Sequence, residues 1–226
     1  MKPGGGHRLL FHVQHLLGIG HLKRAATLSR ALVATGFEVT LVSGGNPVPG
    51  LDSGGARFVQ LAPVRTPDIS FSRLLDANGE VIDDAFRAAR RQALSAVVAE
   101  FQPHVVLTEL FPFGRRQLSF ELIPLLDSLH AEAARPYIVS SVRDILVAPG
   151  KPERMDQMVE RAERYYDLVL VHGDPDLIPF DETFPPAHRI ADRIRYTGYV
   201  VDTPPARGGA GAPGAGEVVV SAGGGG

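Results

Sequence analysis

The stretch RLLFHVQHLLGIGHLKRAATLSRALVATG, residues Arg8 to Gly36, decides the fold of this chain. It opens with an apolar run, Leu9 to Val13, that is typical of a buried strand. A turn containing Gly18 and Gly20 follows, and a helical pattern then runs to Gly36, which is placed to end the helix. A strand, a glycine turn and a helix direct backbone N–H groups and the positive end of a helix towards an anion.

The helix that follows the turn has two predicted faces. The apolar face consists of Leu22, Ala25, Ala26, Ser29, Leu32 and Val33, and the water-facing side of Lys23, Arg24, Thr27 and Arg30. The helix starts with His21, whose side chain gains or loses a proton near neutral pH. A titratable group beside an anion-binding turn predicts transfer chemistry on a substrate that bears a phosphate or a hydroxyl.

Two nucleotide-binding motifs are missing from this region. The dinucleotide fingerprint G-x-G-x-x-G requires a third glycine where this chain has Lys23. The next strand, Glu38–Ser43, leads into Gly44-Gly45-Asn46 instead of ending in the acidic residue that binds a ribose. The phosphate-loop motif G-x-x-x-x-G-K-[ST] does not occur either. An NAD site and a P-loop NTPase are therefore both disfavoured.

The amino-acid composition excludes further classes of protein and of binding site. The chain has 226 residues, enough for one large domain or one and a half, and 44% of them are hydrophobic. The net charge of −2 gives no general basic surface for nucleic acid, and the absence of cysteine excludes disulfides and thiolate zinc sites. No run of 18 apolar residues occurs, so a cytoplasmic protein is the default expectation.

Strands and helices alternate along the rest of the chain. Further strands are predicted at Glu38–Ser43, Arg57–Leu61, His104–Thr108, Tyr137–Val142, Leu168–Val171 and Ile194–Thr197, and further helices at Asp83–Phe101, 116–132 and Pro152–Tyr166. In the helix Asp83–Phe101, the arginines Arg87, Arg90 and Arg91 are expected to face water. This order predicts the α/β class, with a parallel sheet and helices on both of its faces.

The chain is expected to fold as a domain over residues 1–200. Residues 201–216 are rich in Gly, Pro and Ala and are predicted to form a linker. An apolar run within 217–226 is followed by glycines, which predicts the first strand of a second domain; a plain glycine tail is the alternative.

In an open parallel sheet, ligands bind beyond the carboxyl ends of the strands. The side chains and glycines predicted at this edge are His15, Gly18, Gly20, His21, Glu109, Phe111, Phe113, Arg115, Arg143, Asp144 and His172. Of these, His21 is the candidate catalytic residue and the others are candidate substrate-binding residues. No metal-ligand spacing such as H-E-x-x-H connects the histidines, so no metal site is predicted.

Structural roles compete with several of these assignments. His12 lies within a strand and is expected in the core, and His15 has the alternative role of capping its loop. Glu109 is also suited to a structural pair with an arginine. The rings of Phe111 and Phe113 fit either the core or the face of a sugar or lipid, and Arg143 and Asp144 have an internal ion pair as their alternative.

Three segments resemble a known enzyme family. The pattern LLGIGHLKRA (Leu16–Ala25) is similar to the glycine-rich first loop of GT-B glycosyltransferases of the family-28 type, which includes the N-acetylglucosaminyltransferase of peptidoglycan synthesis. The loop TELFPFGRR (Thr108–Arg116) and the segment RYTGYV (Arg195–Val200) are similar to predicted bacterial members. Family loops often have two adjacent glycines, whereas in this chain Ile19 separates Gly18 from Gly20.

The resemblance implies a function. It makes this chain the Rossmann-like N-terminal half of a GT-B fold, which binds the acceptor, while a second domain binds the nucleotide-sugar donor, UDP-linked in this family type. It implies that His21 acts as the base, that Gly18 and Gly20 match the loop glycines, and that no metal is needed. A lipid-linked acceptor would imply peripheral association with a membrane.

Two further classes remain open. One is a non-catalytic half-enzyme or binding module that requires a separate donor-binding chain. The other is a different α/β protein that binds a nucleotide or a sugar, such as an epimerase.

Overall fold

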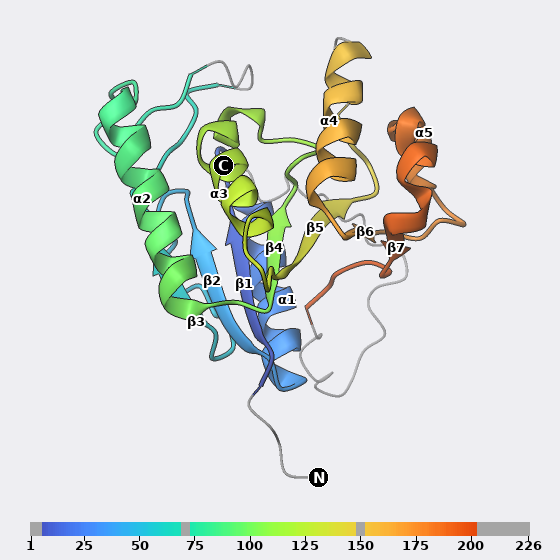
Figure 1. The fold of residues 1–226 in the computed structure, drawn as a ribbon, viewed down its shortest axis with the longest axis horizontal. Coiled ribbons are helices and arrows are strands. Elements are labelled where there is room, and N and C mark those ends of the chain that lie inside the picture. Colours follow the sequence, from blue (N-terminus) through green and yellow to red (C-terminus); the bar gives the residue numbers. More distant parts are fainter. Residues whose placement is uncertain (1–5, 69–72, 148–151, 203–226) are drawn as a thin grey trace, which may run out of the picture.

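A seven-stranded, all-parallel sheet forms the centre of the computed structural model, which describes residues 6–68, 73–147 and 152–202 (Figure 1). Its strand order is β3-β2-β1-β4-β5-β6-β7. The strands are β1 (Arg8–Val13), β2 (Glu38–Ser43), β3 (Arg57–Gln60), β4 (Val105–Glu109), β5 (Tyr137–Arg143), β6 (Leu168–His172) and β7 (Ile194–Tyr196). The predicted α/β class with a parallel sheet is therefore confirmed.

Helices cover both faces of the sheet, as predicted. They are α1 (Gly20–Ala34), α2 (Asp84–Phe101), α3 (Ser119–His130), α4 (Pro152–Tyr165) and the short α5 (Phe180–Thr183), with 3₁₀ turns η1 (Arg116–Leu118) and η2 (Pro185–Arg193). In Figure 1, α1 lies behind the sheet, whereas α2 and α3 lie in front of it. The sequence did not predict α5 and η2, because they are short and flanked by prolines.

Successive apolar side chains of β1 point to opposite faces of the sheet, which explains why helices cover both faces. Leu9, Phe11 and Val13 pack against α1, whereas Leu10 belongs to the core formed with α2 and α3. A strand that buries alternate residues on opposite faces therefore has a continuous apolar sequence.

No helix in the described part of the chain is both long enough and apolar enough to cross a membrane. Beyond residue 202, the predicted linker (201–216) and second-domain strand (217–226) lie outside the described residues.

The order in which the chain adds strands to the sheet reverses at β1. From β1 it proceeds to β2 and β3 on one side, and then returns to β4 on the other side. The neighbouring register of β1 and β4, with His12 opposite Thr108, brings the loops after both strands together at the carboxyl edge. Such a switch point is where open α/β sheets bind ligands.

The prediction that Arg90 faces water is wrong. Its side chain is fully buried and donates to both carboxylate oxygens of Glu121 on α3, at 2.7 and 2.8 Å. It also donates to the Gly44 carbonyl and the Gln14 side chain, each at 3.0 Å. This guanidinium therefore ties α2 and α3 to the loops after β1 and β2. The buried His12, predicted in the core, has its Nε2 3.5 Å from the same carboxylate.

Removing Arg90 should strongly destabilise the fold. Arg90→Met leaves Glu121 buried without its charge partner, which costs about 3–5 kcal/mol, whereas Arg90→Met/Glu121→Leu should restore most of the loss. Although burial alone favours the neutral acid, the hydrogen bonds and charge of Arg90 hold the pKa of Glu121 at about 2. The pair's contribution should be complete above pH 4.5, the ordinary value, and decline as the pH falls towards 2.

Urea unfolding at neutral and acid pH measures both effects. Equal stability of Arg90→Met and the double variant would contradict the assignment of the loss to an unpaired carboxylate.

Candidate active site

Glu109 is the centre of a hydrogen-bonded group at the switch point. It ends β4, and its side chain has no exposed surface. Its Oε1 lies 2.9 Å from Nδ1 of His21, the second residue of α1. The same oxygen accepts from Nε of Arg24 at 3.1 Å and from Nη2 of that arginine. The carboxylate thus holds two side chains of α1 against the end of β4.

The arrangement assigns the tautomer of His21. A carboxylate only accepts hydrogen bonds, so Nδ1 of His21 carries the proton that it shares with Glu109. Arg24 Nη2 lies 3.1 Å from the same Nδ1, but both groups donate to Glu109. The lone pair of the neutral ring is therefore on Nε2, which is the atom available to accept a proton.

The pKa values follow from burial and from these partners. Burial alone would raise the pKa of Glu109, but the hydrogen bond from His21 and the charge of Arg24 hold it at about 2. Burial lowers the pKa of His21 from 6.5, and Glu109 opposes that shift, while the charges of Arg115 and Arg24 add to it. At neutral pH the pair therefore consists of a carboxylate and a neutral imidazole.

A line of hydrogen bonds approaches Glu109 from the opposite side. The Ser141 hydroxyl donates to Glu109 Oε2 at 2.6 Å, and His172 Nε2 lies 2.9 Å from that hydroxyl. Because the serine proton is committed to Glu109, His172 Nε2 donates to Ser141, and its Nδ1 accepts from Thr197 Oγ1 at 2.7 Å. Burial lowers the pKa of His172 to about 4, consistent with a neutral ring.

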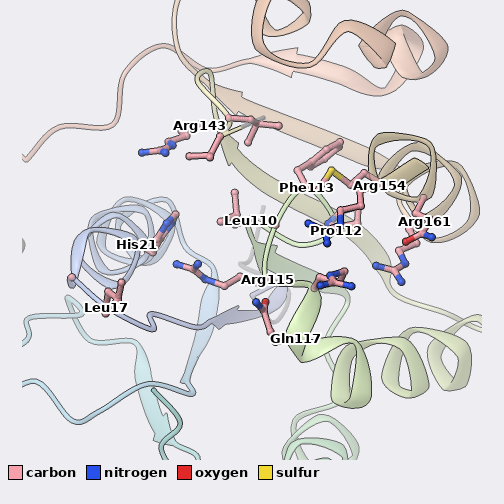
Figure 2. Close-up of a pocket in the computed structure, with 17 residues that line it drawn as sticks. Leu17, His21, Leu110, Pro112, Phe113, Arg115, Gln117, Arg143, Arg154 and Arg161 are labelled. Carbon is pink, nitrogen blue, oxygen red and sulfur yellow. The ribbon is translucent and has the colours of Figure 1, made fainter. Parts of the chain in front are cut away.

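A cavity of about 510 Å³ opens beside His21. The residues that line it are Leu17, Gly18, His21, Leu110, Pro112, Phe113, Gly114, Arg115, Arg116, Gln117, Arg143, Leu146, Val147, Arg154, Gln157, Met158 and Arg161. Figure 2 shows His21 on one side of this cavity, and Arg154 and Arg161 of α4 on the other. Within the described residues, no group of three or more His, Asp or Glu side chains is arranged to hold a metal ion.

The predicted site residues fall into three groups. Five of them line the cavity: Gly18, His21, Phe113, Arg115 and Arg143. Glu109 and His172 lie behind His21, and Gly20 is the first residue of α1. The third group, His15, Phe111 and Asp144, is buried and does not line the cavity.

The three buried residues of the last group contact the core and the neighbouring backbone instead of the cavity. Phe111 belongs to the core, and its carbonyl accepts from the hydroxyls of Thr108 and Ser140. Asp144 accepts from the amide of Ile145 instead of pairing with Arg143. His15 packs against Gly45, where an added Cβ would lie 2.4 Å from its ring.

Several residues of the site were missed by sequence reasoning. Arg24 was placed on the water-facing side of its helix, and this prediction is wrong because it points at Glu109. Its spacing of three residues from His21 was the available signal, since such residues share a helix face. Ser141 lies opposite Glu109 in the sheet register, but finding it requires the strand order. Arg154 and Arg161 lie on a helix for which no ligand was expected.

No protein-family model and no curated protein matches the sequence, but solved structures match the fold. A UDP-glucosyltransferase from Polygonum tinctorium, capable of glucosylating indoxyl, matches with a TM-score of 0.52 and 11% identity, over 89% of this chain and 54% of that one. The glycotransferase of kitacinnamycin matches with 0.51 and 16%, over 93% and 56%. Phytolacca americana UGT2, complexed with UDP-2fluoro-glucose and pterostilbene, matches with 0.50 and 15%, over 88% and 54%.

The fold is that of one half of a GT-B glycosyltransferase. The chain spans just over half the length of these glycosyltransferases, which corresponds to one Rossmann-like domain. At such low identity the likeness concerns the fold alone.

Substitutions around Glu109 should move the pKa of His21 in opposite directions. Glu109→Gln removes the negative charge that opposes the downward shift, so the pKa should fall below the wild-type value. Arg24→Met removes a positive charge, so the pKa should rise. Asp144→Asn, which alters a buried carboxylate without contact to His21, serves as the control and should leave it unchanged.

Proton NMR titration of the His21 ring in the four proteins gives the comparison. A rise of the His21 pKa in Glu109→Gln would contradict the assigned pair.

Proposed function

We propose that this chain is the acceptor-binding half of a GT-B glycosyltransferase, which transfers a sugar from a nucleotide-sugar donor to an acceptor hydroxyl. The observation that carries the proposal is the bond between His21 and the buried Glu109 at the edge of a cavity. A neutral imidazole with its Nδ1–H held by a carboxylate presents Nε2 as a base of suitable strength at neutral pH.

The reaction is a direct displacement. Nε2 of His21 takes the proton from the acceptor hydroxyl while the oxygen attacks the anomeric carbon of the donor sugar. The bond between that carbon and the diphosphate oxygen breaks, and the nucleoside diphosphate leaves with the electron pair. The positive charge that forms on the imidazole lies 2.9 Å from the Glu109 oxygen, which stabilises it.

Burial and the groups around Glu109 set the strength of this base. Burial lowers the His21 pKa below 6.5 against the opposing effect of Glu109, and the charge of Arg24 adds to that downward shift, so the ring is unprotonated before reaction. Ser141 donates to the second oxygen of Glu109 and is itself held by His172, which fixes the direction in which the first oxygen accepts. We assign Arg24, Ser141 and His172 as positioning residues.

The donor is proposed to be UDP-linked, without a required metal, as the resemblance to family 28 implies. A UDP-sugar analogue is bound in one of the structures that share the fold. Direct displacement by a neutral histidine requires no metal on the acceptor side. The donor site itself belongs to the other half of the GT-B fold and comes from a second domain or from a separate chain.

Replacing His21 should remove most of the turnover in the assembled transferase. Positioned proton transfer contributes about 10²–10⁴-fold, so we expect His21→Ala to lower kcat by about that factor. The acidic limb of the wild-type pH–rate profile, set by a His21 pKa below its ordinary value, should disappear. Steady-state kinetics across pH measure both.

His188→Ala is the matched control, because His188 is exposed and bonds only the Pro185 carbonyl among the described residues. It should keep both the rate and the limb. Near-normal kcat with an unchanged profile in His21→Ala would make His21 structural.

The half-enzyme interpretation predicts that these 226 residues alone do not transfer sugar. Transfer requires donor and acceptor to be held together, and the chain spans only 54–56% of the matched glycosyltransferases. A product assay with UDP-sugars should show turnover only after the donor-binding half is added. Sustained turnover by the chain alone would contradict this assignment.

A further inference from the structure

The cavity beside His21 has a charge that proton transfer does not require. Five of the described residues that line it are arginines, and none is an aspartate or glutamate. They are Arg115, Arg116, Arg143, Arg154 and Arg161. The chain as a whole has a net charge of −2, so this concentration of positive charge is local.

The arginines reach the cavity from separate elements. Arg115 and Arg116 follow β4, Arg143 ends β5, and Arg154 and Arg161 belong to α4. The last two are seven residues apart, which places them on one face of the helix about two turns from each other. In Figure 2, Arg115 and Arg143 lie towards His21, and the two arginines of α4 lie on the opposite side.

Four of these arginines lack the carboxylate partners that other arginines in the described part of the chain have. Within the described residues, Arg116, Arg143, Arg154 and Arg161 form no ion pair, and Arg161 lies instead over the Phe111 ring, at 5.8 Å. By contrast Arg164, on the same helix but outside the cavity, pairs with Asp127 at 2.9 Å. The cavity therefore gathers guanidinium groups whose charge the described chain does not neutralise.

The positive charges of neighbouring arginines in the cavity repel one another. Burial lowers the pKa of Arg115 to about 10, and the nearby charge of Arg143 adds to this shift against the opposing effect of Glu109. A bound anion relieves such repulsion. The planar fork of arginine matches the oxygens of a phosphate or carboxylate, which favours these groups over other anions.

Apolar side chains make up much of the remaining lining, beside His21, Gln117 and Gln157. Leu17, Leu110, Phe113, Leu146 and Met158 contribute to the wall between the arginines. Phe113 is held rigidly, because its ring packs edge-on against Phe180 and Phe184 at 5.5 and 5.3 Å. The volume of about 510 Å³ suits a small molecule with an apolar body.

We propose that the acceptor is an amphipathic organic anion, whose phosphate or carboxylate binds Arg154 and Arg161 while its hydroxyl lies at His21. Its apolar body lies against Phe113 and Leu110. This inference rests on the proposed function for the hydroxyl, but anion binding is measurable without any transfer.

Calorimetric titration of the 226-residue chain with 2-naphthyl phosphate, 2-naphthoate and neutral 2-naphthol tests the requirement for charge. At least one anion should bind about tenfold or more tightly than 2-naphthol, since hydrogen bonds to charged groups are worth that factor. Arg154→Gln/Arg161→Gln should remove this preference. Arg164→Gln, the matched control on the same helix, should keep it.

Equal binding of 2-naphthol and both anions, or an unchanged preference in Arg154→Gln/Arg161→Gln, would overturn the proposal. His21→Ala should bind the anion normally. Retained transfer in His21→Ala with intact anion binding would therefore contradict the role of His21 as the base, but not the anionic acceptor. Lost anion preference with His21-dependent transfer would overturn the acceptor class alone.

Vesicles distinguish a lipid-borne anion from a free one. Phosphatidylcholine vesicles that contain phosphatidic acid should compete with 2-naphthyl phosphate if the anion is a lipid headgroup, and pure phosphatidylcholine vesicles should not. Anion binding without competition supports the proposal with a free anionic acceptor. Competition by pure phosphatidylcholine contradicts it, because that surface offers apolar contact without net charge.

Discussion

A carboxylate that is removed from water must be satisfied by protein groups, and Glu109 imposes this constraint on the whole carboxyl edge of the sheet. Leaving such a group unpaired costs several kcal/mol. Glu109 is satisfied by His21 and Arg24 from α1 and by Ser141 from β5. Because these partners come from both sides of β4, one buried charge ties α1, β4 and β5 together.

The same physical device occurs a second time in the fold. Glu121 of α3 is buried and is satisfied by Arg90 of α2, which also donates to the Gly44 carbonyl and the Gln14 side chain. Gln14 in turn accepts from Arg115 through its backbone carbonyl at 2.9 Å. The buried pair thus supports, through the loop after β1, an arginine of the cavity. The contacts that stabilise the fold at Glu121 therefore also help to position Arg115 in the cavity.

The sequence predicted most of the fold, because its strands are continuous apolar runs and its long helices have clear periodicity. It also placed His21 and Glu109 at the same edge of the sheet, since both follow strands. It failed for Arg24 and Arg90 for one reason. Helical periodicity assigns charged residues to water, whereas a guanidinium that finds a buried carboxylate lies inside. The pairing of Glu109 with Ser141 required the order of the strands, which periodicity does not contain.

The central claim is that Glu109 holds His21 as a neutral ring with its lone pair on Nε2. Nitrogen-15 NMR of the histidine-labelled chain at neutral pH observes the protonation of each ring nitrogen separately. The structure predicts a proton on Nδ1, bonded to Glu109, and a bare Nε2. A proton on Nε2 with a bare Nδ1, or protons on both nitrogens at pH 7, would contradict the account.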